Sequence, residues 1–443
     1  MIADLKPYPE YKPSGSVWLG AVPVTWGVRN LRTLISKRAE RDRTDLPLLS
    51  VAREKGVFVR SLTDADENHN VIPEDLSNYK VARPGDLVIN KMKAWQGSMG
   101  IAPCDGIVSP AYFVFDFRIG DRAFGQRLLR SKPYVAHFAQ ASDGVRVGQW
   151  DLSTPGMRQV PVLVPPLAEQ AAIVRFLDWA NERLERAIRA KRKVIALLNE
   201  QKQAIIHRAV TRGLDPSVPL KPSGVPSLGD LPHHWEARRL KWVLRLQRGF
   251  DLPVDRRRSG GVPVYSSGGH IDNHDVALAG SPGIVIGRYG STNAVFFVTE
   301  PYWPHNTALF TTTCYDNDAR WCFYLLRSMA KGAYAGKSAV PGVDRKDLFD
   351  IVVPRPPVDE QRAVARALDI ELAGLELATA YIAKEIDLFR DYRARLIADV
   401  ATGKLDVREA AARLSDEVPA DIAEDDEDLS DETELADEEV VAE

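Results

Sequence analysis

The sequence has few cysteines and no long apolar run. Its three cysteines are scattered over 443 residues, without the paired spacing of a zinc site or a disulfide framework. No apolar stretch approaches the roughly 20 residues that a membrane-spanning helix needs. The N-terminus lacks the pattern of a secretory signal peptide. We therefore expect a reduced, cytoplasmic protein without a structural metal or a membrane span.

Catalytic signatures are also missing. The segment Gly332–Ser338 is similar to a phosphate-binding loop, but it has three residues between its glycines where such a loop needs four. It also follows a predicted helix, whereas a phosphate-binding loop follows a strand. The sequence contains no Asn-Pro-Pro-Tyr or Asp-Pro-Pro-Tyr tetrapeptide of amino-methyltransferases, and the spacing of its loop histidines matches no familiar metal site. The sequence therefore predicts no catalysis.

The chain does contain a stretch that occurs twice, 191 residues apart. The first copy begins Val160-Pro-Val-Leu-Val-Pro-Pro-Leu-Ala-Glu-Gln170, and the second begins Ile351-Val-Val-Pro-Arg-Pro-Pro-Val-Asp-Glu-Gln361. The copies align without a gap as far as Asp215 and Asp406. An internal repeat of this kind predicts two copies of one structural unit.

Each copy predicts a short strand that leads into a long helix. Proline fixes its own φ and lacks an N–H, so Pro165-Pro166 and Pro356-Pro357 suit the start of a helix. Glu169 and Glu360 then fall near the positive end of the helix dipole. Apart from Gly374, neither stretch contains glycine or proline for about ten turns, which gives a rod of roughly 60 Å.

Apolar residues recur in both helices at alternating spacings of three and four, the pattern of a coiled-coil seam. The seam of the second copy comprises Leu368, Leu372, Leu375, Thr379, Ile382, Ile386, Phe389, Arg393, Leu396 and Val400. The matching positions of the first include Leu177, Leu184, Ile188, Ile195 and Leu198, with polar residues at Asn181, Lys191 and Lys202. Those polar residues could set the register or face another subunit. Each helix could instead be a core helix of its own domain, but a helix near forty residues favours two seams that bury each other.

A second repeat precedes each globular part, with an offset of 209 residues. Lys12-Pro-Ser-Gly15 and Trp26 recur as Lys221-Pro-Ser-Gly224 and Trp235. The prolines and glycines predict an ordered loop, which each tryptophan should anchor to the core. The predicted order is a lead-in (1–21), a first globular domain (22–164), a first long helix (165–213), a linker (214–230), a second globular domain (231–355), a second long helix (356–406) and an acidic tail (407–443).

Both globular domains are expected to be mixed and rich in β-structure. Runs of β-branched and aromatic residues bounded by glycine, proline and asparagine predict strands at 86–91, 106–108, 111–117, 283–288, 294–298 and 307–313. One helix should follow in each domain, over about 123–141 and 318–330. The predicted fold class is α+β, with two such domains joined by two long antiparallel helices that form a coiled coil in a pseudo-two-fold tandem repeat.

The net charge of −3 conceals a basic body. From Val407 onward, sixteen acidic residues outnumber two arginines, so this tail carries −14 and residues 1–406 carry +11. A basic body favours a polyanionic partner. The tail from about Ser415 should be disordered, and a solubilising role is favoured over competition with DNA.

Two matched strand-end turns carry the candidate DNA-binding residues. Lysine and arginine can neutralise phosphates, glutamine and asparagine can read an adenine edge, and arginine can also read guanine. Packing is favoured for Trp95, and the alternative for the charged residues is a solvated turn. The candidates are Lys91, Lys93, Trp95, Gln96 and Ser98 in the first domain and Arg288, Tyr289, Ser291 and Asn293 in the second, with Arg146 and Lys337 as weaker ones.

The order of parts, with two Pro-Pro-x-x-Glu-Gln helix starts and two Lys-Pro-Ser-Gly…Trp lead-ins, resembles the specificity (S) subunit of type I restriction–modification systems. The resemblance covers nearly all of residues 12–406. It implies two target-recognition domains that each read one half of a split, asymmetric site in double-stranded DNA. It also implies that the helices set the spacing between these halves, and that this chain holds no cofactor and is not an enzyme.

The resemblance implies partners as well. Two modification subunits would bind S-adenosylmethionine and methylate adenine, and restriction subunits would add translocation and cleavage that use ATP and Mg. An orphan without a methyltransferase, or a protein-binding coiled-coil adaptor without a DNA role, are the alternatives. The residues expected to form the spacer helices and dock the subunits are Pro165, Pro166, Glu169, Gln170, Leu177, Leu184, Pro356, Pro357, Glu360, Gln361, Leu368 and Leu375.

Overall fold

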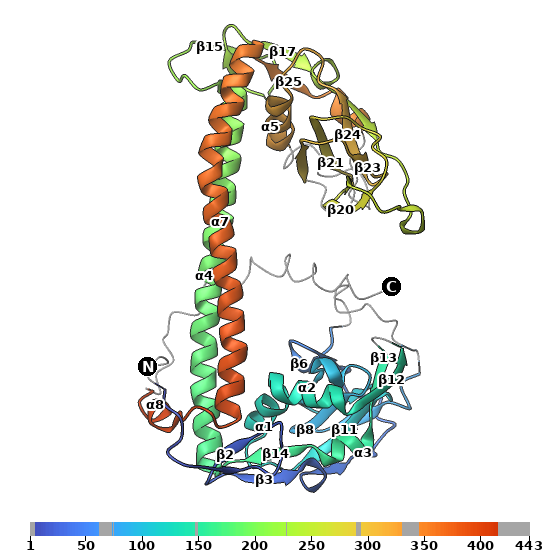
Figure 1. The fold of residues 1–443 in the computed structure, drawn as a ribbon, viewed down its shortest axis with the longest axis vertical. Coiled ribbons are helices and arrows are strands. Elements are labelled where there is room, and N and C mark those ends of the chain that lie inside the picture. Colours follow the sequence, from blue (N-terminus) through green and yellow to red (C-terminus); the bar gives the residue numbers. More distant parts are fainter. Residues whose placement is uncertain are drawn as a thin grey trace. The chain divides into compact units, whose positions relative to one another are not determined.

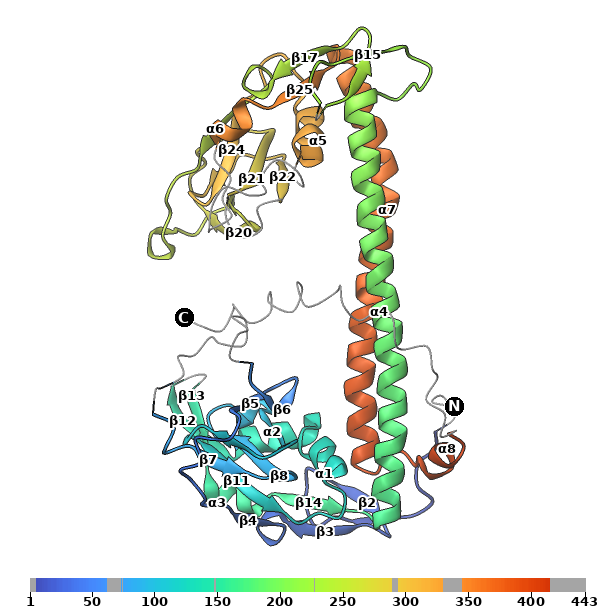
Figure 2. The same cartoon turned by 180° about the vertical axis from the view of Figure 1, so that it is seen from behind.

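The computed structural model describes residues 5–61, 73, 75–146, 149–226, 228–288, 294–329 and 345–414, without the side chains of residues 143–146, 149 and 347. The chain forms two compact units, Met1–Arg189 with Ile386–Glu443, and Ala190–Glu385. Each unit contains one β-rich domain and part of each long helix (Figures 1 and 2). No described helix is long and apolar enough to cross a membrane.

The two long helices are α4 (Leu167–Arg212) and α7 (Val358–Ala401). Each begins directly after its proline pair, as predicted. Gly213 follows α4 and Gly403 lies just beyond α7, both with the left-handed φ that glycine adopts easily after a helix, +76° and +77°. The repeated proline pairs therefore define the helix starts, and a glycine follows each helix end at positions one residue out of register with the repeat.

The two helices pack together, which confirms the predicted pairing (Figure 1). Glu185 forms an ion pair with Arg393 in the first unit. In the second unit Lys191 contacts Glu385 at 2.8 Å, and the Lys202 ammonium donates to the Thr379 hydroxyl at 3.4 Å. Partner numbers fall as α4 numbers rise, so the helices are antiparallel. Two of the three polar seam residues thus bond across the pair.

The first domain is built on a four-stranded antiparallel sheet in the order β4–β11–β8–β9. Its central strand β8 is buried along its whole length, so it forms the middle of the domain. The sheet strands are β4 (Ile35–Lys37), β8 (Asp86–Asn90), β9 (Met99–Ile101) and β11 (Tyr112–Phe117). Around them lie β1 (Tyr11–Pro13), β2 (Ala21–Pro23), β3 (Gly27–Asn30), β5 (Leu49–Ala52), β6 (Gly56–Val59), β7 (Lys80–Ala82), β10 (Gly106–Val108), β12 (Ser142–Arg146), β13 (Gln149–Leu152), β14 (Pro161–Val164) and helices α1 (Arg122–Leu129), α2 (Lys132–Gln140) and α3 (Thr154–Gln159).

The second domain repeats the sheet order as β18–β24–β21–β22, with β21 buried in the place of β8. A three-stranded sheet, β20–β19–β23, is added beside it. The elements are β15 (Leu220–Pro222), β16 (Asp230–Pro232), β17 (Glu236–Arg239), β18 (Arg245–Arg248), β19 (Val262–Ser266), β20 (Gly269–His274), β21 (Gly283–Gly287), β22 (Val295–Val298), β23 (Trp303–Pro304), β24 (Ala308–Thr313), α5 (Ala319–Met329), α6 (Arg345–Phe349) and β25 (Val352–Arg355).

One sequence prediction was wrong. The single helix expected over 123–141 is two helices, because Pro133 cannot occupy a helix interior and instead lies in the first turn of α2. The part of the acidic tail that precedes Ser415 is folded. Residues 407–414 include the short helix α8 (Arg408–Ala412), whose neighbours Val407 and Leu414 are buried with Ala410 and Ala411. This apolar spacing of three and four packs the segment onto the first unit. The remaining tail, 415–443, lies outside the described residues.

Both lead-in tryptophans are completely buried, which confirms their anchoring role. The glycine that ends α4 lies against Trp235, where an added Cβ would be 3.2 Å from the ring. Likewise, a Cβ added at Gly403, beyond α7, would be 3.0 Å from the Trp26 ring. The Asp406 N–H also donates to the Lys6 carbonyl at 2.8 Å. The end of each long helix therefore packs on the lead-in of the other repeat.

Candidate nucleic-acid interface

The turn after β8 presents Met92 and Lys93 to solvent. Buried Asn90 shapes this turn, because its side-chain oxygen accepts from the Met92 N–H at 3.2 Å. Gly97, with φ of +91°, then reverses the chain into β9. In the part of the chain that the structure describes, no carboxylate forms an ion pair with Lys93. Its charge is therefore available to an anionic partner.

The other predicted residues of this turn are more enclosed. Lys91 forms an ion pair with Asp151 of β13 at 2.9 Å. Trp95 packs against Trp150 with ring centroids 5.1 Å apart and donates its N–H to the Met92 carbonyl at 3.1 Å. Ser98 is only 2% exposed, so its hydroxyl is not presented at the surface. Gln96 remains half-buried on the turn.

In the second domain Arg288 directly follows β21, as Lys91 follows β8. Its backbone N–H lies 3.1 Å from the Thr307 carbonyl and 3.2 Å from the Ser267 hydroxyl. Its guanidinium donates to the Asn306 carbonyl at 3.2 Å. The predicted candidates Tyr289, Ser291, Asn293 and Lys337, and the side chain of Arg146, lie outside the described residues.

Each domain is attached to its long helix by the glutamine of the repeat. The Gln170 side chain accepts from the Asp121 N–H at 2.8 Å and donates to the Pro165 carbonyl at 2.7 Å. Gln361 accepts from the Asp318 N–H at 2.8 Å and donates to the Pro356 carbonyl at 2.9 Å. Asp121 caps α1, and Asp318 likewise accepts from the backbone of the first turn of α5. The glutamine therefore fixes the domain helix to the start of the long helix.

The glutamate of the repeat holds the lead-in. The Trp26 N–H donates to the Glu169 carboxylate at 2.9 Å, and the Trp235 N–H donates to Glu360 at 3.0 Å. Glu169 is 5% exposed, so a bond to a charged acceptor is made inside the core. If the tryptophan N–H were removed, this buried carboxylate would lose a hydrogen-bond donor and the fold would lose stability.

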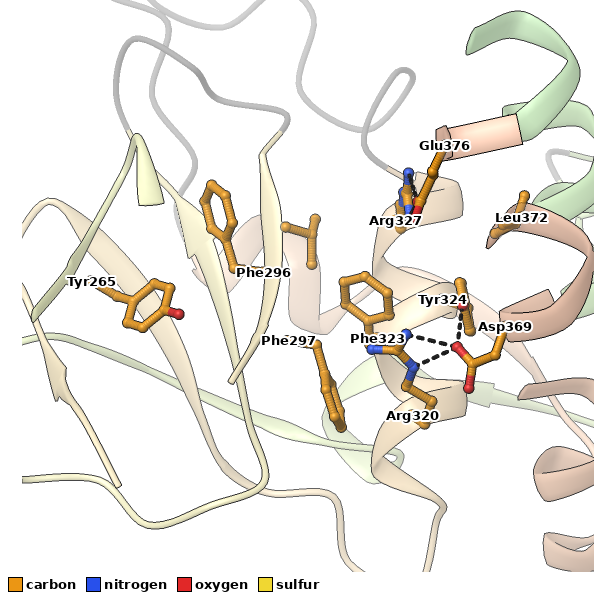
Figure 3. Close-up of a pocket in the computed structure, with 11 residues that line it drawn as sticks. Tyr265, Phe296, Phe297, Arg320, Phe323, Tyr324, Arg327, Asp369, Leu372 and Glu376 are labelled. Atoms are coloured by element: carbon orange, nitrogen blue, oxygen red, sulfur yellow. Dashed lines mark hydrogen bonds and ion pairs between the residues drawn. The ribbon is translucent and has the colours of Figure 1, made fainter. Parts of the chain in front are cut away.

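A third pair of equivalent contacts fastens each domain helix to its long helix. Asp178 of α4 forms an ion pair with Arg127 of α1. In the second unit, Asp369 of α7 bonds Arg320 of α5 at 2.7 Å and accepts from the Tyr324 hydroxyl at 2.5 Å. Figure 3 shows the bonds of Asp369 with Arg320 and Tyr324, which line a hollow of about 300 Å³.

Aromatic rings surround this contact in the second unit. The Arg320 guanidinium lies over the rings of Phe297 and Phe323, at 4.7 and 4.9 Å. Arg327 forms a further ion pair with Glu376 at 3.3 Å (Figure 3). Burial and the hydrogen bond to the Asp369 carboxylate raise the pKa of Tyr324. The hydroxyl therefore stays protonated and keeps donating.

No protein-family model matches the chain. A curated protein of Methanocaldococcus jannaschii, assigned as the specificity subunit of the type I restriction enzyme MjaX, is 22% identical over 438 residues, which cover 88% of this chain and 96% of that protein. A chain solved in work on complex assembly and conformational transition of the type I restriction–modification system superposes with a TM-score of 0.61 at 15% identity, covering 87% of this chain and 99% of that chain. The chain shares the fold of that type I restriction–modification chain. The resemblance and the fold class predicted from the sequence are thereby confirmed.

In this fold, most of the residues expected to dock other subunits are committed to internal contacts. Leu177, Leu184 and Leu368 are buried, and so are Glu169, Gln170 and Gln361. Pro166 and Pro357 are exposed, whereas Pro165 and Pro356 are buried and Glu360 and Leu375 are half-buried. The exposed apolar side chains of the long helices are others, namely Leu167, Leu197, Ile370, Leu377, Tyr381 and Leu388, each more than half exposed.

Proposed function

We propose that the chain is the non-catalytic DNA-specificity subunit of a type I restriction–modification complex. Each β-rich domain reads one half of a split, asymmetric site, and the helix pair sets the distance between the halves. One observation carries the proposal. The same three anchoring contacts hold two domains of the same sheet order, whose strand-end turns carry different side chains, Lys91 and Lys93 in one and Arg288 in the other. A common scaffold with two different reading edges suits a site with two different halves.

The exposed apolar side chains of α4 and α7 support docking of two modification subunits on the helices. Large apolar groups in water are unfavourable, and contiguous ones mark protein interfaces. Ile370 is 79% exposed and Tyr381 62% exposed. The modification subunits would bind S-adenosylmethionine and methylate adenine, and restriction subunits would use ATP and Mg. The full-length match to an assigned specificity subunit favours this proposal over a coiled-coil adaptor without a DNA role.

The proposal is tested by expressing the chain with the methyltransferase encoded beside its gene and mapping methylated adenines on host DNA. A split, asymmetric methylated motif is the expected result. Exchanging residues 231–355 for the second domain of another specificity subunit should change one half of that motif and leave the other intact. A stable complex without methylation would indicate an inactive assembly, and absence of both complex and methylation would favour the adaptor.

Replacing Lys93 with glutamine should weaken DNA binding equally for all sequences. Loss of one phosphate contact lowers the slope of log affinity against log salt by about 1. Lys91→Gln should have a smaller effect, because Asp151 already neutralises that charge at 2.9 Å. The exposed Lys384 on α7 provides the matched control, since Lys384→Gln removes the same charge outside the recognition domains. Equal slopes for Lys93→Gln and wild type, measured by fluorescence anisotropy, would exclude Lys93 from the interface.

A further inference from the structure

Two arginines of the second domain converge on one carbonyl oxygen. Arg248, the last residue of β18, donates from its Nε to the Asn306 carbonyl at 3.2 Å. Arg288, just after β21, donates from its Nη1 to the same oxygen, also at 3.2 Å. The two strands flank β24 on opposite sides. The guanidinium groups therefore meet at the turn that leads into β24.

The backbone fixes this convergence. Gly249 lets the end of β18 approach the turn, because a Cβ there would lie 2.1 Å from the His305 carbonyl. The Gly249 N–H donates to the Ala308 carbonyl at 3.0 Å, which locks the two segments together. On the other side, the Arg288 N–H is held by the Thr307 carbonyl. Both arginines thus extend from anchored positions.

The acceptor that the two cations share carries no formal charge. Asp251 lies nearby, but its carboxylate accepts from the Asn306 side-chain amide at 2.6 Å. Among the residues that the structure describes, no carboxylate forms an ion pair with Arg248. In the first domain, by contrast, Arg38 beyond β4 donates two bonds to buried Asp86. In the second domain, two adjacent guanidinium groups thus share one carbonyl acceptor.

We propose that Arg248 and Arg288 together hold one backbone phosphate of DNA at this edge of the second domain. A phosphate oxygen matches the donor geometry of guanidinium and would supply the negative charge that the Asn306 carbonyl lacks. The inference rests on the proposed DNA-specificity function and adds a residue, Arg248, to it. A phosphate contact fixes the position of the domain on the duplex and leaves base reading to other side chains.

The test uses the full chain in complex with its methyltransferase and a mixed-sequence DNA duplex, with affinity measured over a salt series. The variants are Arg248→Gln, Arg288→Gln and the double substitution. Two arginines on one phosphate should act non-additively, so the double variant should lose about 0.9 in the slope of log affinity against log salt. A loss of about 1.8 would assign two separate phosphates and overturn the shared clamp.

The substitution Arg248→Lys distinguishes a contact with DNA from a purely structural role of Arg248. It keeps the charge, so the salt slope should return while the affinity recovers in part, because lysine lacks the fork of donors. Arg245→Gln, an exposed charge on the same strand, should behave like wild type. If wild type binds DNA with a steep salt dependence and the double variant matches it, the clamp is excluded while the specificity function stands. If wild type itself shows no salt-dependent binding, the specificity function fails as well.

Discussion

Replacing Trp235 with alanine should destabilise the unit of residues 190–385 by about 3–5 kcal/mol, the usual cost of deleting a fully buried tryptophan. The ring is completely buried, and its N–H is bonded to Glu360 at 3.0 Å. Its loss would leave a cavity under the lead-in and a carboxylate without one of its donors. Gly213, at the end of α4, would lose the surface on which it rests.

Amide hydrogen exchange measures this effect unit by unit. Protection should fall in residues 228–288 and 345–385 and remain close to wild type in the first domain. Trp26→Ala should give the opposite distribution, because Trp26 occupies the equivalent place in the other unit. Trp242→Ala is the matched control, since this tryptophan is 64% exposed and should be replaceable at almost no cost. Equal losses for Trp235→Ala and Trp242→Ala would contradict the anchoring role.

Deleting one heptad from each long helix should shorten the spacer of the methylated motif. Segments 192–198 and 380–386 are suitable because they face each other beside the Lys191–Glu385 contact. A heptad removes about 10 Å of helix. At roughly 3.4 Å per base pair, the two half-sites should approach by about three base pairs. Methylation mapping on a library of spacer lengths would reveal the new optimum.

The control for this deletion is removal of segment 192–198 alone. That change shifts α4 against α7 and should separate Glu185 from Arg393, so the helices could no longer pair along their length. A soluble, active protein with an unchanged spacer preference after the double deletion would remove the spacing role from the helices. If the spacing of the half-sites shifts while the half-site sequences stay the same, the result supports the spacing role of the helices.

The sequence repeat predicted much of this architecture, because residues close together in the chain determine where the helices and strands begin and end. Proline pairs set the helix starts, and the predicted strands appear within one or two residues of their expected limits. The single helix predicted over 123–141 was wrong, because Pro133 starts a second helix. A repeat in the sequence also does not show whether a repeated side chain points into the core or toward solvent. Gln170 and Gln361 were predicted to form the spacer helices and dock the subunits, and in the structure their side chains bond inward to Asp121 and Asp318.

The convergence of Arg248 and Arg288 could not be predicted from the sequence. It depends on a turn near residue 306, far from either arginine in the chain, and on the absence of a side chain at Gly249. The same holds for Arg320 and Asp369, which are 49 residues apart. The repeated Asp178 and Asp369 were visible in the sequence, but the arginines that bind them occupy different positions in α1 and α5.

The contacts of Lys6 with Asp406 and of Tyr11 with the Gly403 carbonyl, at 2.8 and 3.1 Å, join the beginning of the first repeat to the end of the second. The other junction, from α4 into the second lead-in, is covalent. Non-covalent contacts thus join the two ends of the repeat pair, and a circular permutant opened near 214–219 should keep the fold. By the same logic, a chain containing one repeat alone should make both kinds of junction as a homodimer, and the DNA site of that homodimer should be a palindrome.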